Sequence, residues 1–396
     1  MTVPPLPLEV VSLIVDHAAA SAEDEQERRR LGVRIALVCR AWKELGVRAA
    51  WRILTLDMDK DEHLLAFLLE RPTVLSNVRE LDIKGLRRFE EPEDDEDDED
   101  EYEDPMDTRA AVQRLFDLCP RIDKLSLDQL SPTLELVDMA SRAPLQSTLR
   151  SMSCCVLGEE AHLSRLAATL STFPRLRALR VFYKYCGTQP SLPAPPFSKV
   201  KLRCFELLLL GVCTAAEADT SIRTILSLCD ISAIKDVYLM PVYSVDSVLP
   251  FFTPTSLTKL LLSAVSHPVV RDILASLVVT LPSLINLHSL SIIPEAFKAI
   301  TYAKDDLSPV PLHTVLSAFP PSLCLVHFSG LYFEFALPLP VITDRARIDA
   351  MGISGIAVFP FHSGRSDGSF NSDNVRNFQA VGFRSAVGRI AWALVL

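Results

Sequence analysis

The stretch VRELDI, residues 78–83, carries apolar side chains at its first, fourth and sixth positions. The last two, Leu81 and Ile83, are two residues apart, so they point to one face of a β-strand, and Val78 turns the chain into that strand. The same spacing recurs eight times downstream, with steps of 44, 27, 27, 26, 32, 23, 30 and 36 residues between central positions. The pattern therefore predicts irregular repeats that each supply one strand.

The eight recurrences share this L-x-x-L-x-L spacing, with other apolar residues allowed at each position. Nine such matches in order exceed what chance gives in a Leu-rich chain. The recurrences are Ile122, Leu125, Leu127; Leu149, Met152, Cys154; Leu176, Leu179, Val181; Leu202, Phe205, Leu207; Ile234, Val237, Leu239; Leu257, Leu260, Leu262; Leu287, Leu290, Ile292; and Leu323, Val326, Phe328.

The segments between these strands have helical length and composition. Residues 61–70, 161–170 and 269–281 are examples, and a proline follows several of the helices, where it ends them. A strand and a helix in each repeat leave a face that the next repeat covers, so we expect parallel strands with helices outside, in a curved solenoid. Most steps are close to the length of a leucine-rich repeat, and the missing fixed Asn makes the array resemble the degenerate form.

The N-terminal stretch, residues 6–51, has a different pattern. Pro7 and Glu9 suit the first turn of a helix, where a missing N–H costs nothing and a carboxylate faces the positive end of the dipole. Val10, Leu13, Ile14 and His17 then fall on one side of that helix, which we expect to be short and amphipathic. Residues 18–30 are polar and charged, and we interpret them as a helical or mobile surface insert.

A second helix is predicted after this insert. The apolar residues Leu31, Ile35, Val38, Trp42, Leu45 and Ala49 follow one another in steps of four and three, which keeps them on one face of an α-helix. Two or three short helices bury little surface. An exposed apolar patch that awaits a partner is therefore expected on this module.

These residues resemble a known family. The LPLEV of residues 6–10, Ile14, the LVCRAW of residues 37–42 and a closing Trp51 look like an F-box, the helical module that docks onto a Skp-type adaptor of cullin-RING ubiquitin ligases. Together with the degenerate leucine-rich repeats, the chain resembles the large fungal F-box family. The match covers about an eighth of the chain, and residues 18–30 form a longer and more charged spacer than the family's common short link.

The resemblance implies roles for individual residues. Val38, Cys39 and Trp42 would shape the packed helix pair, and we expect Cys39 to be a small buried hydrophobic residue. The part of the module that faces the adaptor includes the start of the first helix. The adaptor-binding residues implied by the resemblance are Leu6, Pro7, Val10, Ile14, Leu37, Val38 and Trp42.

The net charge of −10 comes largely from one segment. Residues 90–104 contain thirteen Asp or Glu among fifteen residues, and without them the formal charge is +3. No basic stripe is visible in the linear sequence, so a nucleic-acid partner is not expected. The acidic run repels itself and lacks apolar residues, which predicts a disordered loop over residues 89–107. It is either a solubilising loop or a clamp for a basic partner.

Nine cysteines lie mostly within apolar segments, without a CxxC pair. This usage is typical of reduced, buried thiols, so we expect a cytoplasmic or nuclear protein. The N-terminus lacks the pattern of a secretory signal. Residues 273–293 are uncharged, but Pro282 and several polar side chains interrupt them, so neither a membrane span nor a membrane partner is expected.

Catalytic and metal-binding motifs are not recognised in the sequence. The GRSDG of residues 364–368 matches the GxSxG of hydrolases, yet no His follows Ser366 to complete the order Ser, acid, His. The His, Cys and carboxylate residues show no metal-ligand spacing. We therefore expect no catalytic residue, no metal and no cofactor, and an esterase-like enzyme would depend on Ser366 alone.

The sequence thus predicts an α+β chain with three parts. These are a helical F-box-like module over residues 1–56, a degenerate leucine-rich-repeat solenoid over residues 57–340, and a C-terminal cap or irregular segment over residues 341–396. In the last part, residues 356–359 are a candidate strand and residues 374–387 a candidate helix.

The expected function is that of a non-catalytic substrate-recognition subunit of a ubiquitin ligase, with a Skp-type adaptor and a cullin complex as partners. A repeat scaffold without ubiquitin transfer is the alternative. The protein substrate and its binding residues are unknown from the sequence. Exposed positions on the strand face that could contact it include Asp82, Lys84, Ser126 and Asp128.

Overall fold

In the computed structural model, the chain divides into two compact units. The first unit is Met1–Phe182 with Pro193–Val200, and the second is Tyr183–Leu192 with Lys201–Leu396. The structure describes residues 7–21, 25–85, 108–127, 133–187, 199–211, 214–243, 256–264, 267–294, 310–311, 320, 322–323, 325–331, 333–334, 378–384 and 390–395.

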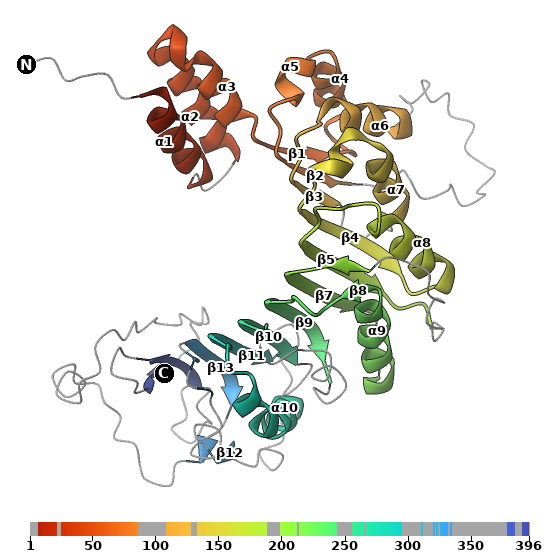
Figure 1. The fold of residues 1–396 in the computed structure, drawn as a ribbon, viewed down its shortest axis with the longest axis vertical. Helices are drawn as coiled ribbons and strands as arrows, with labels where there is room; N and C mark the ends of the chain where they lie inside the picture. Colours follow the sequence, from red (N-terminus) through yellow and green to blue (C-terminus); the bar gives the residue numbers. More distant parts are fainter. Residues whose placement is uncertain are drawn as a thin grey trace, which may run out of the picture. The chain divides into compact units, whose positions relative to one another are not determined.

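The first unit begins with a small helical module. It contains α1 (Leu8–Ala20), α2 (Glu25–Val38), the short 3-10 helix η1 (Arg40–Trp42) and α3 (Lys43–Ala50), shown in red in Figure 1. The predicted single helix through residues 31–49 is wrong, because Cys39 has an extended backbone, with φ −163° and ψ 167°, that separates α2 from η1. A 3-10 turn preserves the spacing of apolar residues, so the sequence pattern does not reveal the break.

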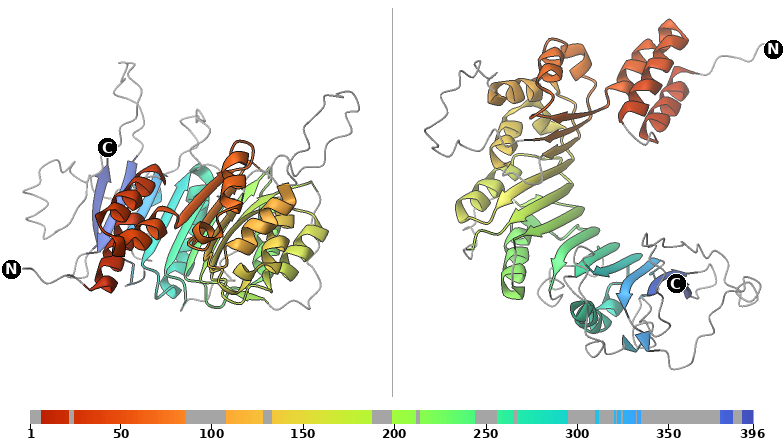
Figure 2. Two further views of the ribbon diagram at one scale, coloured as in Figure 1. Left: turned by 90° about the horizontal axis from the view of Figure 1, so that it is seen from above. Right: turned by 180° about the vertical axis from the view of Figure 1, so that it is seen from behind.

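Strands and helices alternate after this module. The strands are β1 (Ile53–Asp57), β2 (Glu80–Lys84), β3 (Lys124–Leu127), β4 (Ser151–Leu157) and β5 (Ala178–Lys184), and their spatial order follows their order in the chain. The helices between them are α4 (Glu62–Leu69), α5 (Pro72–Leu75), α6 (Thr108–Leu118), α7 (Leu134–Arg142), η3 (Pro144–Ser147) and α8 (Glu160–Leu170). Helices α6, α7 and α8 lie along one face of this sheet (Figure 1, Figure 2).

The strands β1 to β4 are parallel and pair the repeat positions with one another. Leu54 is opposite Leu81, Leu81 is opposite Leu125, and Leu125 is opposite Met152. All four side chains are at most 1% exposed. The β1 strand also carries the repeat spacing, since Leu54 and Leu56 follow Trp51, so the sheet begins within residues 1–56, before the first repeat identified in the sequence.

A buried polar contact joins two helices of the first unit. The Asp138 carboxylate on α7 pairs with the Arg165 guanidinium and accepts a hydrogen bond from the Thr169 hydroxyl, both on α8. Asp138 is only 9% exposed. Removing either partner group would leave a buried carboxylate incompletely bonded, so the contact fixes how α7 and α8 pack.

The second unit repeats the same plan. Strands β7 (Cys204–Leu210), β9 (Asp236–Val242), β10 (Lys259–Ala264), β11 (Ser289–Pro294) and β13 (Leu325–Leu331) are parallel neighbours in this order. Helix α9 (Ala215–Ser227) contacts β7 and β9, and α10 (His267–Thr280) contacts β10, β11 and β13. The shorter elements are β6 (Val200–Lys201), β8 (Cys229–Asp230), η5 (Leu281–Ser283), β12 (Val310–Pro311) and β14 (Phe333–Glu334).

The repeat pattern predicted from the sequence gives strands at all nine positions. In the first eight of the nine triplets, counted from residues 78–83, every apolar residue is at most 3% exposed. Leu323 of the ninth triplet is 1% exposed. The predicted helices at residues 61–70, 161–170 and 269–281 correspond to α4, α8 and α10. Mixed helix and strand with parallel pairing is therefore the architecture of the chain.

The C-terminal strands differ from this plan. Strand β15 (Phe378–Arg384) pairs antiparallel with β13 and with β16 (Ile390–Val395). The helix predicted over residues 374–387 is therefore wrong for the described residues 378–384, whose extended backbone pairs with a strand on each side. The acidic run at residues 90–104 and the candidate strand at residues 356–359 lie outside the described residues. None of the helices described is long and apolar enough to cross a membrane.

Candidate functional site

Helix α1 has two apolar faces. Val11, Val15 and Ala19, spaced four residues apart, are at most 4% exposed and form its buried face. Val10, Leu13 and Ile14 are 39%, 70% and 54% exposed on the rest of the helix. A helix of a folded soluble protein normally directs its large apolar side chains to the core. The second apolar face of α1 does not, and exposed apolar surface of this kind is typical of sites that bind a partner.

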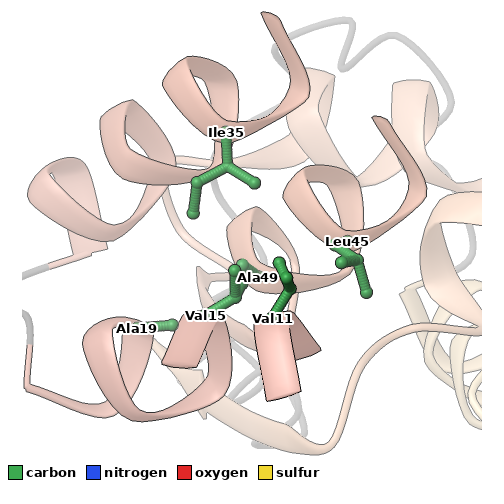
Figure 3. Packing of buried hydrophobic residues seen from close by; sticks show 6 residues of the cluster. All are labelled: Val11, Val15, Ala19, Ile35, Leu45 and Ala49. Carbon is green, nitrogen blue, oxygen red and sulfur yellow. The ribbon is translucent and has the colours of Figure 1, made fainter. Parts of the chain in front are cut away.

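The buried face of α1 packs against α2 and α3. Val11, Val15 and Ala19 meet Ile35 of α2 and Leu45 and Ala49 of α3 in one cluster (Figure 3), and Leu31 and Trp42 pack against it. This set is small, consisting mainly of Val and Ala with two larger aliphatic residues. The module can thus form its core without using the exposed apolar residues of α1 and α2.

Two glycines allow α2 and α3 to approach closely. A Cβ atom at Gly32 would lie 2.5 Å from the Cβ of Ala50 and 2.5 Å from the carbonyl oxygen of Gly46. A Cβ atom at Gly46 would in turn meet the backbone of Gly32 and Ala36. The two helices therefore contact through backbone atoms, and this close crossing fixes where the side chains of α2 are presented.

The charged insert contributes to the module's structure. Arg28, expected within a solvated surface insert, is only 8% exposed, and its Nε donates a hydrogen bond of 3.0 Å to the carbonyl oxygen of Ala19. It satisfies a carbonyl in the last turn of α1, where a cation is also favoured by the helix dipole. The guanidinium of Arg29 lies 4.9 Å from the ring centre of Trp51. The insert thus links α1, α2 and the end of α3.

Ion pairs add a further link between α1 and the residues around α3. Asp16 lies 3.4 Å from Arg48 and 3.6 Å from Arg52, and Arg48 also donates to the Ser12 hydroxyl. These groups are about one third exposed, so each pair contributes at most about 1 kcal/mol to stability. Their main effect is to orient α1 and thereby its exposed face.

The structure divides the implied adaptor-binding residues into groups. Pro7, Val10, Ile14, Leu37 and Val38 are exposed, with Leu37 at 79% and Val38 at 60%. Trp42 is half-buried against the core cluster and therefore supports the module. Leu6 lies outside the described residues. Cys39 is exposed, so the expectation that it is buried is wrong.

The implied adaptor-binding residues omit two exposed apolar residues: Leu13, which the sequence pattern placed on the same side of the helix as Val10 and Ile14, and Val33, which the pattern did not single out. Leu13 and Val33 are 70% and 56% exposed, and they lie one helical turn from Val10 and Leu37 respectively. Their i, i+3 and i, i+4 spacing to those residues is the signal that could have identified them. We call Val10, Leu13, Ile14, Val33, Leu37 and Val38 the exposed apolar set.

The expected substrate-contacting positions lie on the strands of the first unit. Asp82 is half-buried and pairs with Lys84 at 3.2 Å, and Ser126 lies opposite Asp82 on the neighbouring strand. Asp128 lies outside the described residues. Lys124 also pairs with Glu80 across the strands at 3.1 Å. This part of the sheet surface is charged and internally paired.

The structure gives no geometry for a reaction at Ser366, which lies outside the described residues. Within the described part of the chain, no group of three or more His, Cys, Asp or Glu side chains could hold a metal ion. No protein-family model matches the chain, and no curated protein matches its sequence.

Proposed function

We propose that this chain is the substrate-recognition subunit of a Skp-cullin-F-box type ubiquitin ligase. In this proposal the N-terminal module is an F-box that binds a Skp-type adaptor, and the strand-helix repeats are a degenerate leucine-rich-repeat solenoid that binds a target protein. The chain itself performs no chemistry, since proximity between target and ligase is sufficient for transfer. The cytosol and the nucleus are the compartments that fit this role.

The observation that carries the proposal is the exposed apolar set on a module with a separate core. Leu13, Ile14 and Leu37 are each more than half exposed, while the core cluster is complete without them. Covering a large aliphatic side chain with a partner contributes roughly 1.5 to 3 kcal/mol when burial is complete. A few such residues on short helices are enough to anchor a helical partner.

The test is capture of a Skp-type adaptor by the full chain in a pull-down. A Leu13→Asp, Ile14→Asp double variant should lose capture, because two charges would be buried in the interface without partners. The matched control is Val279→Asp with Ile285→Asp, two apolar residues that are 82% and 54% exposed in the second unit. This control should capture adaptor as well as the unsubstituted chain does.

Retained capture by the α1 double variant, with its fold intact by circular dichroism, would contradict the proposed interface. Co-purification of a cullin separates the ligase subunit from the alternative, a scaffold. Adaptor capture without a cullin and without ubiquitin transfer to any bound protein would favour the scaffold.

A further inference from the structure

A row of residues crosses the first unit just before its strands. The backbone N–H of Arg79 donates to the carbonyl of Arg52, that of Asp123 to Arg79, that of Arg150 to Asp123, and that of Arg177 to Arg150, each at 2.8 Å. We call these five residues the entry row. Neighbouring members are one strand spacing apart, about 4.8 Å, although up to 44 residues separate them in sequence.

Four of the five side chains in the entry row are arginines. Arg150 and Arg177 are exposed, and Arg79 is partly exposed. Arg52 pairs with Asp16, but among the described residues no carboxylate pairs with Arg79, Arg150 or Arg177. Arg79 donates to the carbonyl of Arg121 at 3.2 Å, and Arg177 to that of Leu176 at 2.9 Å. Their guanidinium groups keep further donors for an external anion.

The single carboxylate of the row lies within the field of its arginines. Burial and the Glu80 carboxylate raise the pKa of Asp123, whereas the guanidinium groups of Arg79, Arg52 and Arg150 act to lower it. Arg79 precedes β2 and Arg150 precedes β4, so arginines flank Asp123 on both neighbouring strands. With four arginines and one carboxylate, the row has a positive excess.

The carboxyl ends of the same strands carry charges of both signs, since β2 ends at Lys84 and β5 ends at Lys184. Strand β1 ends at Asp57, and Asp59 and Asp61 follow within the next turn. Hydrogen bonding to Lys60 holds the pKa of Asp57 below its usual value, so this carboxylate stays ionised. Carboxylates and lysines therefore lie together at this end of the strands, whereas the entry row has four arginines and one carboxylate.

We propose that the entry row binds an extended acidic peptide segment of the target protein through Arg79, Arg150 and Arg177. Guanidinium groups bind carboxylates through paired, charge-assisted hydrogen bonds, and an extended segment that crosses the strands meets one arginine after another. This assignment names the class of target that the proposed function leaves open. Binding of the peptide does not depend on the proposed function; only the ubiquitination of the bound target protein does.

A peptide fits the row better than a nucleic acid does. Asp123 and Glu80 interrupt the positive track that a continuous phosphate backbone needs. Base stacking needs exposed aromatic faces, but Phe173, in the turn before β5, is only 1% exposed, and the ring of Trp51, beside Arg52, already contacts the guanidinium of Arg29.

The test uses the full chain and a fluorescent peptide in which glutamate alternates with glycine, at low ionic strength. A matched peptide has glutamine at each glutamate position. An Arg150→Gln, Arg177→Gln double variant should bind the glutamate peptide about tenfold or more weakly than the unsubstituted chain. The control, Arg114→Gln with Arg223→Gln, removes the same charge from exposed positions on α6 and α9 and should bind within about twofold of the unsubstituted chain.

An opposite change gives a second readout. Asp123→Asn removes the one negative charge of the row and should strengthen peptide binding about threefold, an effect that rising salt diminishes. Equal loss in the control variant, unchanged binding in the Arg150, Arg177 variant, or equal binding of the glutamine peptide would overturn the proposal. Tighter binding of single-stranded DNA or RNA than of the glutamate peptide would overturn the class of partner.

The outcome is independent of adaptor binding. The Arg150, Arg177 variant should still capture a Skp-type adaptor if the proposed function is correct. Loss of peptide binding with intact adaptor capture supports both proposals. If the glutamate peptide fails to bind the unsubstituted chain while adaptor capture is normal, the entry-row proposal alone is rejected.

Discussion

Individual cysteines of this chain have different environments that their sequence neighbours do not reveal. Cys119, Cys154, Cys155 and Cys229 are buried, whereas Cys39 and Cys186 are exposed. Cys39 belongs to the segment that separates α2 from η1, and the apolar residues beside it turn away from the core there. A thiol next to Val38 and Trp42 in the sequence is therefore accessible, which a helical interpretation of the pattern does not predict.

We expect Cys119 to make the chain less stable at alkaline pH. Burial raises the pKa of its thiol from the ordinary 9.0 to about 12. The unfolded thiol loses its proton first, so its effect on the free energy of unfolding is absent below about pH 9 and destabilising between about pH 9 and about pH 12.

A comparison of urea unfolding between the unsubstituted chain and Cys119→Ala across this pH range checks the prediction. The variant is less stable at neutral pH because it leaves a cavity, and the difference between the two proteins should shrink as the pH rises. A difference that stays constant up to pH 12 would show that Cys119 ionises as easily in the folded chain as in the unfolded one.

At the scale of elements, the module depends on the crossing of α2 and α3. Helical patterning identifies Ile35, Leu45 and Ala49 as core residues, and the structure buries all three. It does not identify Gly32 and Gly46 as contact residues, because glycine carries no apolar side chain to count. The exposed apolar set was only partly anticipated for a related reason, since Val10 and Val11 look alike until the orientation of α1 is known.

We predict that Gly46→Ala destabilises the module. Alanine is favoured over glycine in a helix by about 1 kcal/mol, but its methyl group would meet the backbone of Gly32 and Ala36. Overpacking of this kind typically costs about 1 to 3 kcal/mol, so the clash should prevail. Hydrogen exchange of the α2 and α3 amides within the full chain measures the effect.

The control for this experiment is Val33→Ala, which changes an exposed residue of α2. It should leave the exchange rates of the α2 and α3 amides nearly unchanged. Slower exchange in Gly46→Ala than in the unsubstituted chain would mean that the helices separate easily to admit the methyl group, and the close crossing would then be unimportant for stability.

At the scale of the whole molecule, the buried ladder of repeat positions forms a large part of the apolar core of each unit. Leu81, Leu125 and Met152 contact their counterparts strand by strand in the first unit, and Val237, Leu260 and Leu290 do so in the second. Each strand covers part of its neighbour's apolar face. This mutual coverage needs apolar side chains at a fixed spacing, and Leu, Met and Val all occupy the paired positions.

We expect Leu125→Ala to cost about 2 to 5 kcal/mol, because Leu125 is fully buried between Leu81 and Met152. Ser126→Ala, at the next residue and on the other face of β3, should change stability by about 0.5 kcal/mol or less. Denaturant unfolding of both variants makes the comparison. Similar losses in the two would contradict the assigned register of β3.

The sequence predicts the strands well because the spacing of apolar residues that marks each strand lies within six consecutive residues. All nine triplets therefore coincide with strands, whereas β15 was mistaken for a helix in a segment without the repeat spacing. The entry row is the clearest feature that linear inspection misses. Arg79, Arg150 and Arg177 are widely separated in sequence, so no basic stripe is visible until parallel pairing brings them together. The second position of the six-residue L-x-x-L-x-L pattern, directly after its first apolar residue, was the signal that could have revealed it.

The hydrogen bonds of the entry row also bear on how such a chain can diversify. Their donors and acceptors are main-chain atoms, so the side chains of the row are not needed for the register. The second unit illustrates this freedom, since Arg203, Lys235, Thr258 and His288 occupy the same position with the same bonding. One substitution per repeat can thus exchange the charge pattern while the sheet stays folded. The charge of the surface before the strands can therefore be changed, or redesigned, at one strand without changing the others.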